Sequence, residues 1–339
     1  MVKSIHELED RLAQPSDELV EEIGKLDGDI MLLGVGGKMG PSLGRLAVNA
    51  IKKSGVHREV IGASRFSSGG LREELEAAGV RTIAVDLLND AELQRLPDVK
   101  NIIYMAGNKF GTQGNEHFTW SMNAYLPGRV AEKFRNSRIV VFSTGNVYPL
   151  TPVKQGGATE DSPTGPVGEY GQSCLGRERI FEHFSHKNGT EMTIYRLNYA
   201  VDLRYGVLLE LAKAVQEQRP IDIEMGHANC IWQGDANEIA LRSLSICSNP
   251  PTVLNVTGPE TISLRWAAEE FGKRLGKTPV FIGEEAPTAL LSNAGKSNQL
   301  FGYPKVSLRQ MIDWIAEWVQ SDGPTWNKPT HFQEREGKY

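Results

Sequence analysis

A glycine-rich turn follows the first strongly apolar run of the chain. The run is Ile30-Met31-Leu32-Leu33, and a helical pattern begins behind the turn. Glycines at positions 34, 37 and 40 allow a strand to turn sharply into a helix and to approach a pyrophosphate closely. The helix N-terminus offers unpaired N–H groups and a positive dipole end to phosphates. The sequence therefore predicts a dinucleotide site formed by Gly34, Gly36, Gly37, Lys38, Met39 and Gly40.

Strands and helices alternate after this turn. We expect strands at 30–33, 58–63, 81–85, 99–105, 138–142 and 191–196, and helices at 71–78, 118–134 and 170–186. Pro127 should kink the 118–134 helix. Beyond residue 198, helices at 207–218, 237–247, 264–275 and 307–320 and a strand at 253–256 are expected. The pattern predicts an α/β fold, a doubly wound parallel sheet (Rossmann) with a smaller mixed α/β C-terminal substrate region.

Four segments are expected along the chain. Residues 1–27 form an N-terminal helical extension of two short helices, the second with Ser16 as its N-cap. Residues 28–198 form the dinucleotide-binding Rossmann domain with part of the active site, and residues 199–320 form the substrate-binding region. Residues 321–339 form a polar, extended C-terminal tail with two prolines.

Composition narrows the class of partner and the compartment. The 339 residues carry a net charge of −5, which argues against a nucleic acid or an anionic membrane as partner. Three cysteines without metal or redox spacing fit a reducing cytosol better than a disulfide framework. The sequence shows neither a signal peptide nor an apolar stretch of about 20 residues that could span a membrane. We therefore expect a cytoplasmic protein with a small-molecule substrate.

The end of the second expected strand bears on the choice of cofactor. A carboxylate there would bind ribose hydroxyls and favour NAD, but the chain has Ser64 and Arg65, followed by Ser67 and Ser68. A guanidinium with hydroxyls suits a 2′-phosphate, so NADP is favoured over NAD. Arg65 and Lys38 could instead be ordinary surface charges. Further cofactor contacts are expected at the ends of the next two strands, from Asp86, Leu87, Met105, Ala106 and Gly107.

These motifs, taken together, resemble a known family. The order and spacing resemble the extended short-chain dehydrogenases/reductases, in their NAD(P)-dependent epimerase/dehydratase branch, over roughly residues 28–320. The resemblance rests on the glycine turn, Asp86, Ala106-Gly107, Asn123 on the long helix, Ser143-Thr144 with Val147-Tyr148, Tyr170-Gly171 with Ser173, and Asp235. It implies a cofactor contact from Asn123 and a homodimer built from the 118–134 and 170–186 helices.

The resemblance also implies a catalytic Ser/Thr, a Tyr and a Lys. Thr144 would hold the substrate oxygen, and Tyr170 would act as acid or base. In the family a lysine one turn later binds the nicotinamide ribose and lowers the pKa of the tyrosine. Here Cys174 stands at the lysine position. A neutral thiol supplies neither a lasting charge nor strong ribose hydrogen bonds.

Three explanations of Cys174 stay open. A cation from elsewhere could serve: Lys109 follows the fourth strand, and Arg177 shares a helix face with Tyr170 but lies about 10 Å further along the helix axis. The chain could also bind NADP without turnover, as a binding or sensor protein. Finally, Cys174 could itself react, although a lone cysteine on a packed helix is usually inert.

The substrate side departs from the family pattern as well. Nucleotide-sugar enzymes of the family often carry an arginine where this chain has Asn229-Cys230, so a diphosphate would lack a partner. A smaller polyhydroxy compound or sugar acid is favoured as substrate of an oxidoreductase or epimerase. Candidate substrate contacts are Asn108, Lys109, His117, Asn198, Tyr199 and Arg204. No metal site is expected, because His183 and His186 share a helix face without a third ligand nearby in sequence.

Overall fold

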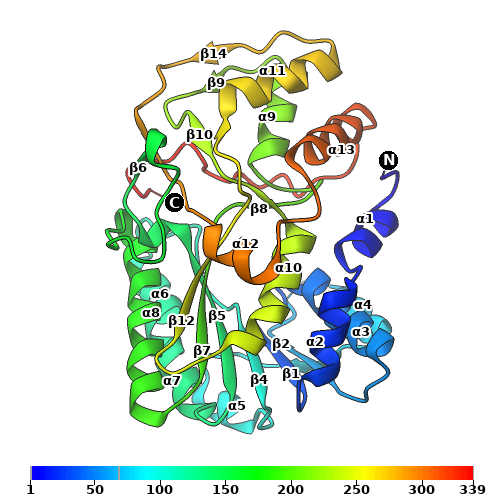
Figure 1. Ribbon diagram of the computed structural model, residues 1–339, viewed down its shortest axis with the longest axis vertical. Helices are drawn as coiled ribbons and strands as arrows, with labels where there is room; N and C mark the ends of the chain where they lie inside the picture. The colour runs from blue at the N-terminus through cyan, green and yellow to red at the C-terminus, as the bar shows by residue number, and fades with distance from the viewer. Residues whose placement is uncertain (1, 68, 339) are drawn as a thin grey trace.

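A seven-stranded parallel sheet forms the centre of the protein in a computed structural model that describes residues 2–67 and 69–338 (Figure 1). Its strands are β1 (Ile30–Leu33), β2 (Val60–Ser64), β3 (Arg81–Ala84), β4 (Asn101–Tyr104), β5 (Arg138–Thr144), β7 (Met192–Leu197) and β12 (Thr252–Val256). They lie in the order β12-β7-β5-β4-β1-β2-β3, and all neighbouring pairs are parallel. The predicted doubly wound sheet is confirmed, with the strand order reversing between β1 and β4.

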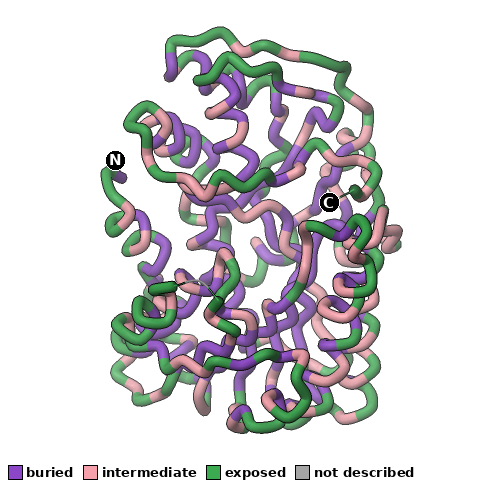
Figure 2. The backbone as a smooth tube through the Cα atoms, turned by 180° about the vertical axis from the view of Figure 1, so that it is seen from behind, coloured by how far each residue is buried: buried purple, intermediate pink, exposed green. Residues whose placement is uncertain are grey.

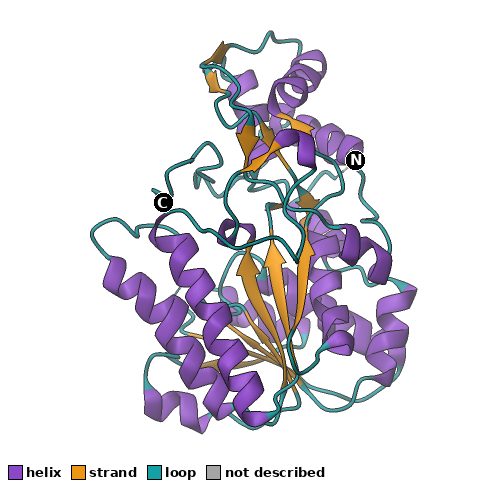
Figure 3. Cartoon of the chain, turned by 60° about the vertical axis from the view of Figure 1, so that its left-hand side comes forward, coloured by secondary structure: helices purple, strands orange, loops and turns teal. Residues whose placement is uncertain are grey.

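Apolar side chains cover both faces of this sheet, and helices flank it on either side (Figure 3). Along β1, Ile30 and Leu32 pack with α2 (Asp17–Lys25), α3 (Gly40–Ser54), α4 (Leu71–Ala78) and α10 (Gln233–Arg242). Met31 and Leu33 pack with α5 (Asp90–Arg95), α7 (Leu126–Lys133) and α8 (Gly168–Asn188). Burial on both faces explains why β1 is apolar throughout rather than alternating.

The long helix around Pro127 is divided rather than simply kinked. It consists of α6 (Glu116–Trp120), a π-helical turn at Ser121–Tyr125, and α7, which carries Pro127 in its first turn. Proline has no N–H to donate, and the first turn of a helix needs none at that position. Pro127 is therefore accommodated at the start of α7. The π-helical turn lies directly before α7 and carries the buried Asn123.

A second, smaller region lies beyond the carboxyl ends of the strands, at the top of Figures 1 and 3. Its helices are α9 (Val207–Gln216), α11 (Leu264–Leu275) and α13 (Leu308–Gln320), and its core includes Trp232 and Trp318. Helix α12 (Gly295–Phe301) instead packs against β12 of the main sheet. Short strands pair as β9 (Ile221–Asp222) with β14 (Phe281–Ile282), β10 (His227–Ala228) with β13 (Ile262–Ser263), β8 (Ala200–Val201) with β11 (Ile231–Trp232), and β6 (Thr151–Pro152) with β15 (Thr288–Ala289). This confirms the mixed α/β region of the sequence prediction.

Some elements from the second half of the chain belong to the sheet and not to the smaller region. Strand β12 and helix α10 belong to the stretch 199–320 but complete the sheet and cover one of its faces. A single boundary at residue 198 therefore does not separate the two cores. Figure 2 shows buried chain continuing from the sheet into the smaller region.

The N-terminal extension forms the two expected helices, α1 (Ile5–Leu12) and α2, and Ser16 caps α2 by accepting from the Leu19 N–H at 3.0 Å. Leu8 and Leu12 of α1 enter the core of the smaller region, whereas α2 packs on the sheet. The Ser16 hydroxyl also donates to Glu238 on α10 at 2.6 Å. The extension thus contacts both regions of the protein.

The C-terminal segment, residues 321–338, is extended and packed against the smaller region. From α13 it crosses the molecule to the side of α8, as the red chain of Figure 1 shows. The Trp326 N–H donates to the Arg204 carbonyl at 3.1 Å, and the Thr330 hydroxyl donates to Glu210 at 2.9 Å. A Cβ added at Gly168, in the first turn of α8, would lie 2.3 Å from the Gly337 carbonyl oxygen. Met1, Ser68 and Tyr339 lie outside the described residues.

Candidate functional site

The glycine turn joins β1 to α3 with almost no space for side chains. Gly34 has a φ of +92°, and a Cβ there would lie 2.7 Å from the Ala106 nitrogen at the end of β4. A Cβ on Gly40 would lie 2.0 Å from the Val35 carbonyl oxygen. A Cβ on Gly36 would meet the Ser64 hydroxyl at 2.5 Å. The residues fit a dinucleotide, because this turn places bare backbone at the start of a helix beside the switch point of the sheet.

The end of β2 places Arg65 in solvent. Arg65 is exposed and forms no hydrogen bond or ion pair within the described part of the chain. Ser64 lies against the turn, as the contact with Gly36 indicates, and no carboxylate occurs between residues 64 and 67. Ser68, the last of the expected hydroxyls, is outside the described residues.

Asp86 at the end of β3 is bonded locally. Its side chain accepts from the Leu88 N–H at 3.0 Å, and its own N–H donates to Glu92 at 2.8 Å. Its side chain is exposed, whereas Leu87 is buried. Asn89, not Asp86, is the N-cap of α5.

A cavity of about 450 Å³ opens at the carboxyl ends of β1, β4, β5 and β7. Many of the residues singled out in the sequence line it: Gly34, Gly37, Lys38, Met39, Met105, Gly107, Asn108, Lys109, Thr144, Tyr170, Asn198 and Tyr199. Further lining residues, which sequence reasoning did not select, include Phe110, Phe142, Asn146, Tyr205, Gln233 and Thr330. This cavity is therefore lined by four parts of the chain: the glycine turn, the ends of the strands, α8 and the C-terminal segment.

Other candidates lie elsewhere. His117 is exposed on α6, and Arg204 is engaged with Asp202, at 2.8 Å between guanidinium and carboxylate. Neither residue lines this cavity. Cys174 and Asn123 are fully buried behind the cavity wall.

Thr144 and Tyr170 face each other across the end of β5. The Thr144 hydroxyl donates to the Asn146 side chain at 3.0 Å and hydrogen-bonds Tyr170 on the first turn of α8. Burial raises the pKa of Tyr170 well above its usual value, Cys174 raises it further, and Arg177 and Thr144 oppose the change. Burial also raises the pKa of Cys174. Both groups therefore stay protonated near neutral pH, and Tyr170 is a proton donor there.

Two lysines at the cavity have lowered pKa values, so their positive charge depends on pH. Burial, together with the nearby positive charges of Lys109 and Lys328, lowers the pKa of Lys38 to about 7. Burial lowers the pKa of Lys109 to about 8. The Lys38 ammonium lies 3.3 Å from the ring centroid of Tyr205, and the Lys109 ammonium lies 5.7 Å from that of Tyr170. An anion bound here would restore the charge of both lysines.

Arg177 reaches the cavity although its Cα lies two turns beyond Tyr170. Its guanidinium donates to the Phe142 carbonyl at 2.7 Å and to the Asn123 side-chain oxygen at 2.8 Å. A helical side chain points back toward the N-terminus of its helix. The Arg177 guanidinium therefore lies closer to Tyr170 than the separation of the two Cα atoms suggests. The expected separation of about 10 Å therefore does not keep this cation away from the site.

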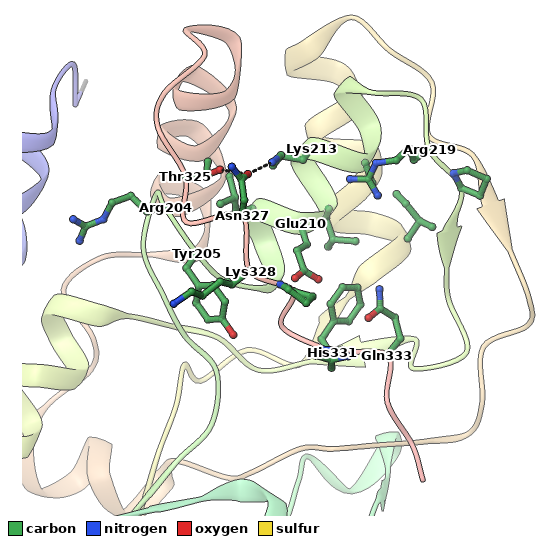
Figure 4. Close-up of a pocket in the computed structure, with 18 residues that line it drawn as sticks. Arg204, Tyr205, Glu210, Lys213, Arg219, Thr325, Asn327, Lys328, His331 and Gln333 are labelled. Carbon is green, nitrogen blue, oxygen red and sulfur yellow. Dashed lines mark hydrogen bonds between the residues drawn. The ribbon is translucent and has the colours of Figure 1, made fainter. Parts of the chain in front are cut away.

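A second cavity, of about 430 Å³, lies between α9 and the C-terminal segment (Figure 4). Glu210 lies within it and accepts from the Thr330 hydroxyl. Lys213 donates to Asn327 at 3.1 Å at one side. Tyr205 lines both cavities, so the two hollows adjoin there. The basic residues around the second cavity are Arg204, Lys213, Arg219 and Lys328.

The described residues offer neither a metal cluster nor a membrane-spanning helix. Among residues 2–67 and 69–338, no three His, Cys, Asp or Glu side chains gather as a metal ion would require. Within the same residues no helix has the length and apolar character needed to cross a membrane.

Comparison with known proteins identifies the family. A model of the NAD dependent epimerase/dehydratase family matches residues 30–201, about half of the chain. The chain belongs to this family. No curated protein matched the chain.

Solved structures share the fold at low identity. A dTDP-glucose 4,6-dehydratase from Streptomyces venezuelae with bound NAD has a TM-score of 0.72 at 17% identity, over 87% of this chain and 97% of that one. A UDP-glucuronic acid 4-epimerase mutant from Bacillus cereus, in complex with a UDP-sugar acid analogue and NAD, has a TM-score of 0.71 at 18% identity, over 86% and 99%. A UDP-glucose 4-epimerase from Thermus thermophilus with NAD has a TM-score of 0.70 at 18% identity, over 86% and 99%.

Proposed function

We propose that this protein is an NAD(P)-dependent oxidoreductase or epimerase that acts at a carbinol or carbonyl carbon of a small sugar-like substrate. The observation that carries the proposal is the pairing of the Thr144 and Tyr170 hydroxyls at the cavity that also contains the glycine turn. When bound, the nicotinamide ring supplies a site that accepts or returns a hydride. Thr144 orients the substrate oxygen, and Tyr170 donates a proton to it.

Because burial raises the pKa of Tyr170, carbonyl reduction is favoured over carbinol oxidation near neutral pH. A phenol that stays protonated is ready to donate but is a poor base. The test is turnover on polyols, sugar acids and their keto forms. Net oxidation or reduction is followed by the absorbance of the reduced nicotinamide, and epimerisation, which returns the hydride, is followed by proton NMR of the sugar. Reduction of a keto compound on this panel supports the enzyme.

The same experiment addresses a second function. Cys174 at the lysine position favours a protein that binds the dinucleotide without turnover. Tight cofactor binding with no turnover on the panel would support that function and overturn the enzyme.

We propose NADP as the preferred cofactor, with NAD as the alternative. The structural neighbours contain NAD, but the end of β2 offers Ser64 and the solvent-exposed Arg65 in place of a carboxylate. Arg65→Ala should weaken NADP⁺ binding about tenfold and leave NAD⁺ binding unchanged, because a guanidinium–phosphate contact is charge-assisted. Calorimetric titration measures both, with Arg72→Ala, an exposed arginine on α4, as control. An equal loss for both dinucleotides would refute the preference.

Cofactor affinity should fall as pH rises. The lysines at 38 and 109 have pKa values of about 7 and about 8, so the free protein loses both charges between about pH 6 and about pH 9. A bound pyrophosphate favours the protonated lysines, so affinity should drop about tenfold or more over this range. Titrations at several pH values measure the slope, and Lys38→Met should flatten it. A pH-independent affinity would contradict an anion beside these lysines.

We propose a small substrate with an acidic group, such as a sugar acid. Asn229 is committed to the fold: its amide donates to the Glu260 carbonyl at 3.0 Å and accepts from the Ser292 N–H at 2.8 Å. It therefore offers no cation to a diphosphate. Lys213, Arg219 and Lys328 around the adjoining cavity suit a carboxylate. Thermal shifts with sugar acids, neutral sugars and nucleotide sugars distinguish the classes, and stabilisation by nucleotide sugars alone would reject this substrate.

We also propose a homodimer through the segment that runs from α6 to α7 and through α8. Trp120 and Tyr125 are 38% and 55% exposed beside these helices, which is unusual for large apolar side chains. Tyr125→Glu should convert a dimer into a monomer in light scattering. Tyr303→Glu is the control, because Tyr303 is 73% exposed on the segment between α12 and α13. A wild-type monomer would rule the dimer out.

A further inference from the structure

Arg177 is a buried cation without a carboxylate in contact. Its side chain is almost fully buried, and none of the ion pairs among the described residues includes it. Its two hydrogen-bond partners, the Phe142 carbonyl and the Asn123 amide oxygen, are both neutral. Its Nε is buried and has no acceptor within the described chain. A buried charge left in this state is costly unless a further group contacts it.

The guanidinium lies where the reacting groups of the site meet. Its Nη2 atom would be 2.4 Å from a Cβ added at Gly107, so it sits against the bare backbone at the end of β4. Its other hydrogen bond reaches Phe142 on β5, two residues before Thr144. Arg177 also lines the cavity together with Tyr170 and the glycine turn. The charge is therefore placed between the cofactor side and the proton donor.

Asn123 connects this arginine to the position of the missing lysine. Its amide nitrogen donates to the Ser173 hydroxyl at 3.0 Å and lies 3.9 Å from the Cys174 sulfur. Its amide oxygen accepts from Arg177 and from the Asn108 N–H, both at 2.8 Å. Cys174 and Arg177 thus contact the same side chain, that of Asn123. Because the Cys174 thiol is small, the Asn123 amide oxygen is available to the Arg177 guanidinium.

We propose that Arg177 is the fixed cation of this site, taking over from one helical turn away the role that a lysine at position 174 has in the family. It contacts the nicotinamide half of the cofactor and supports the Tyr170 phenol. This inference rests on the proposed function, because it requires that a dinucleotide binds at the glycine turn.

Lys109 is the competing cation. Its ammonium lies 5.7 Å from the Tyr170 ring centroid, but burial lowers its pKa to about 8, so its charge is lost in mildly alkaline solution. A guanidinium keeps its charge at every pH of interest, and its planar fork holds several oxygens at once. Arg177 also has fixed hydrogen bonds to β5 and to the π-helical turn, which orient it without a ligand.

The test compares two ligands that share the adenosine diphosphate half. NAD⁺ or NADP⁺, whichever binds more tightly, is titrated calorimetrically beside ADP or its 2′-phosphorylated form, which lack the nicotinamide half. Arg177→Met should weaken the dinucleotide about tenfold or more and change the half-ligand less than about twofold. Arg177→Gln, which keeps N–H donors without the charge, is measured in the same way in case the methionine variant does not fold.

Two variants complete the experiment. Cys174→Lys combined with Arg177→Met should recover the affinity for the dinucleotide to within about threefold, because the charge returns to the same pocket. Lys109→Met should leave the ratio of the two affinities unchanged. An unchanged ratio in both Arg177 variants, or a dinucleotide-specific loss in Lys109→Met alone, would overturn the inference while leaving the proposed function intact. A wild-type protein that binds neither dinucleotide would overturn both.

Discussion

Replacement of Tyr170 by phenylalanine is expected to lower turnover by a factor of roughly 10²–10⁴ and to leave dinucleotide affinity unchanged. The phenol hydrogen-bonds Thr144 at the end of β5 and, because burial raises its pKa, carries a transferable proton at neutral pH. Phenylalanine keeps the ring and the packing of the cavity wall. The effect therefore reports loss of the proton donor alone.

The measurement is steady-state turnover on the compound that the substrate panel identifies, together with calorimetric cofactor titration. Tyr303→Phe is the control, since Tyr303 lies exposed between α12 and α13. Turnover of Tyr170→Phe within about threefold of wild type would show that another residue supplies the proton.

The second large effect concerns stability. Glu178→Gln is expected to lower the free energy of unfolding by roughly 3–5 kcal/mol, because it leaves the Arg196 guanidinium buried without its counter-charge. Glu178 on α8 accepts two hydrogen bonds from Arg196 on β7, at 3.0 and 2.6 Å, and a third from the Ser143 hydroxyl on β5. Arg196 also donates to the Tyr148 hydroxyl at 2.6 Å. One carboxylate thus links three elements beneath the site.

Denaturant unfolding measures this effect, with the slope expected to stay constant. Glu182→Gln on the same helix is the matched control, because its ion pair with Arg179 is solvent-exposed and such pairs contribute at most about 1 kcal/mol. Equal losses in the two variants would mean that the buried network does not stabilise the fold.

The sheet could be predicted because its signals are local. The apolar run 30–33 and the glycines behind it require a strand, a tight turn and a helix in that order, and the Leu71–Ala78 and Leu264–Leu275 helices agree with the structure to the residue. The short α5 was missed, since six residues give little periodicity. The return of β12 to the sheet was missed as well, because one apolar run does not say which strand it will pair with.

The site was only partly predictable, for a different reason. Spacing along a helix places Cα atoms, so it located Tyr170 and Cys174 but set Arg177 too far away. The direction and length of its side chain, which determine where the charge lies, are not part of that spacing. The contribution of Thr330 to the cavity depends on how a segment without periodicity packs after α13, and no pattern in the sequence encodes that path. The exposure of His117 and the pairing of Arg204 with Asp202 could not be predicted either, because exposure and ion pairing are decided by tertiary contacts.

The central claim is that the glycine turn holds a dinucleotide, and calorimetric titration of NADP⁺ and NAD⁺ into the wild type and Gly40→Ala tests it most directly. A Cβ at Gly40 would lie 2.0 Å from the Val35 carbonyl oxygen, so alanine should open the turn. Gly24→Ala on α2 is the control, since a Cβ there meets only the Ser54 Cβ at 3.7 Å, an ordinary contact. The account predicts one dinucleotide per chain, an affinity lowered about tenfold or more by Gly40→Ala, and no change in the control. No binding to the wild type, or equal binding to the folded Gly40→Ala variant, would contradict it.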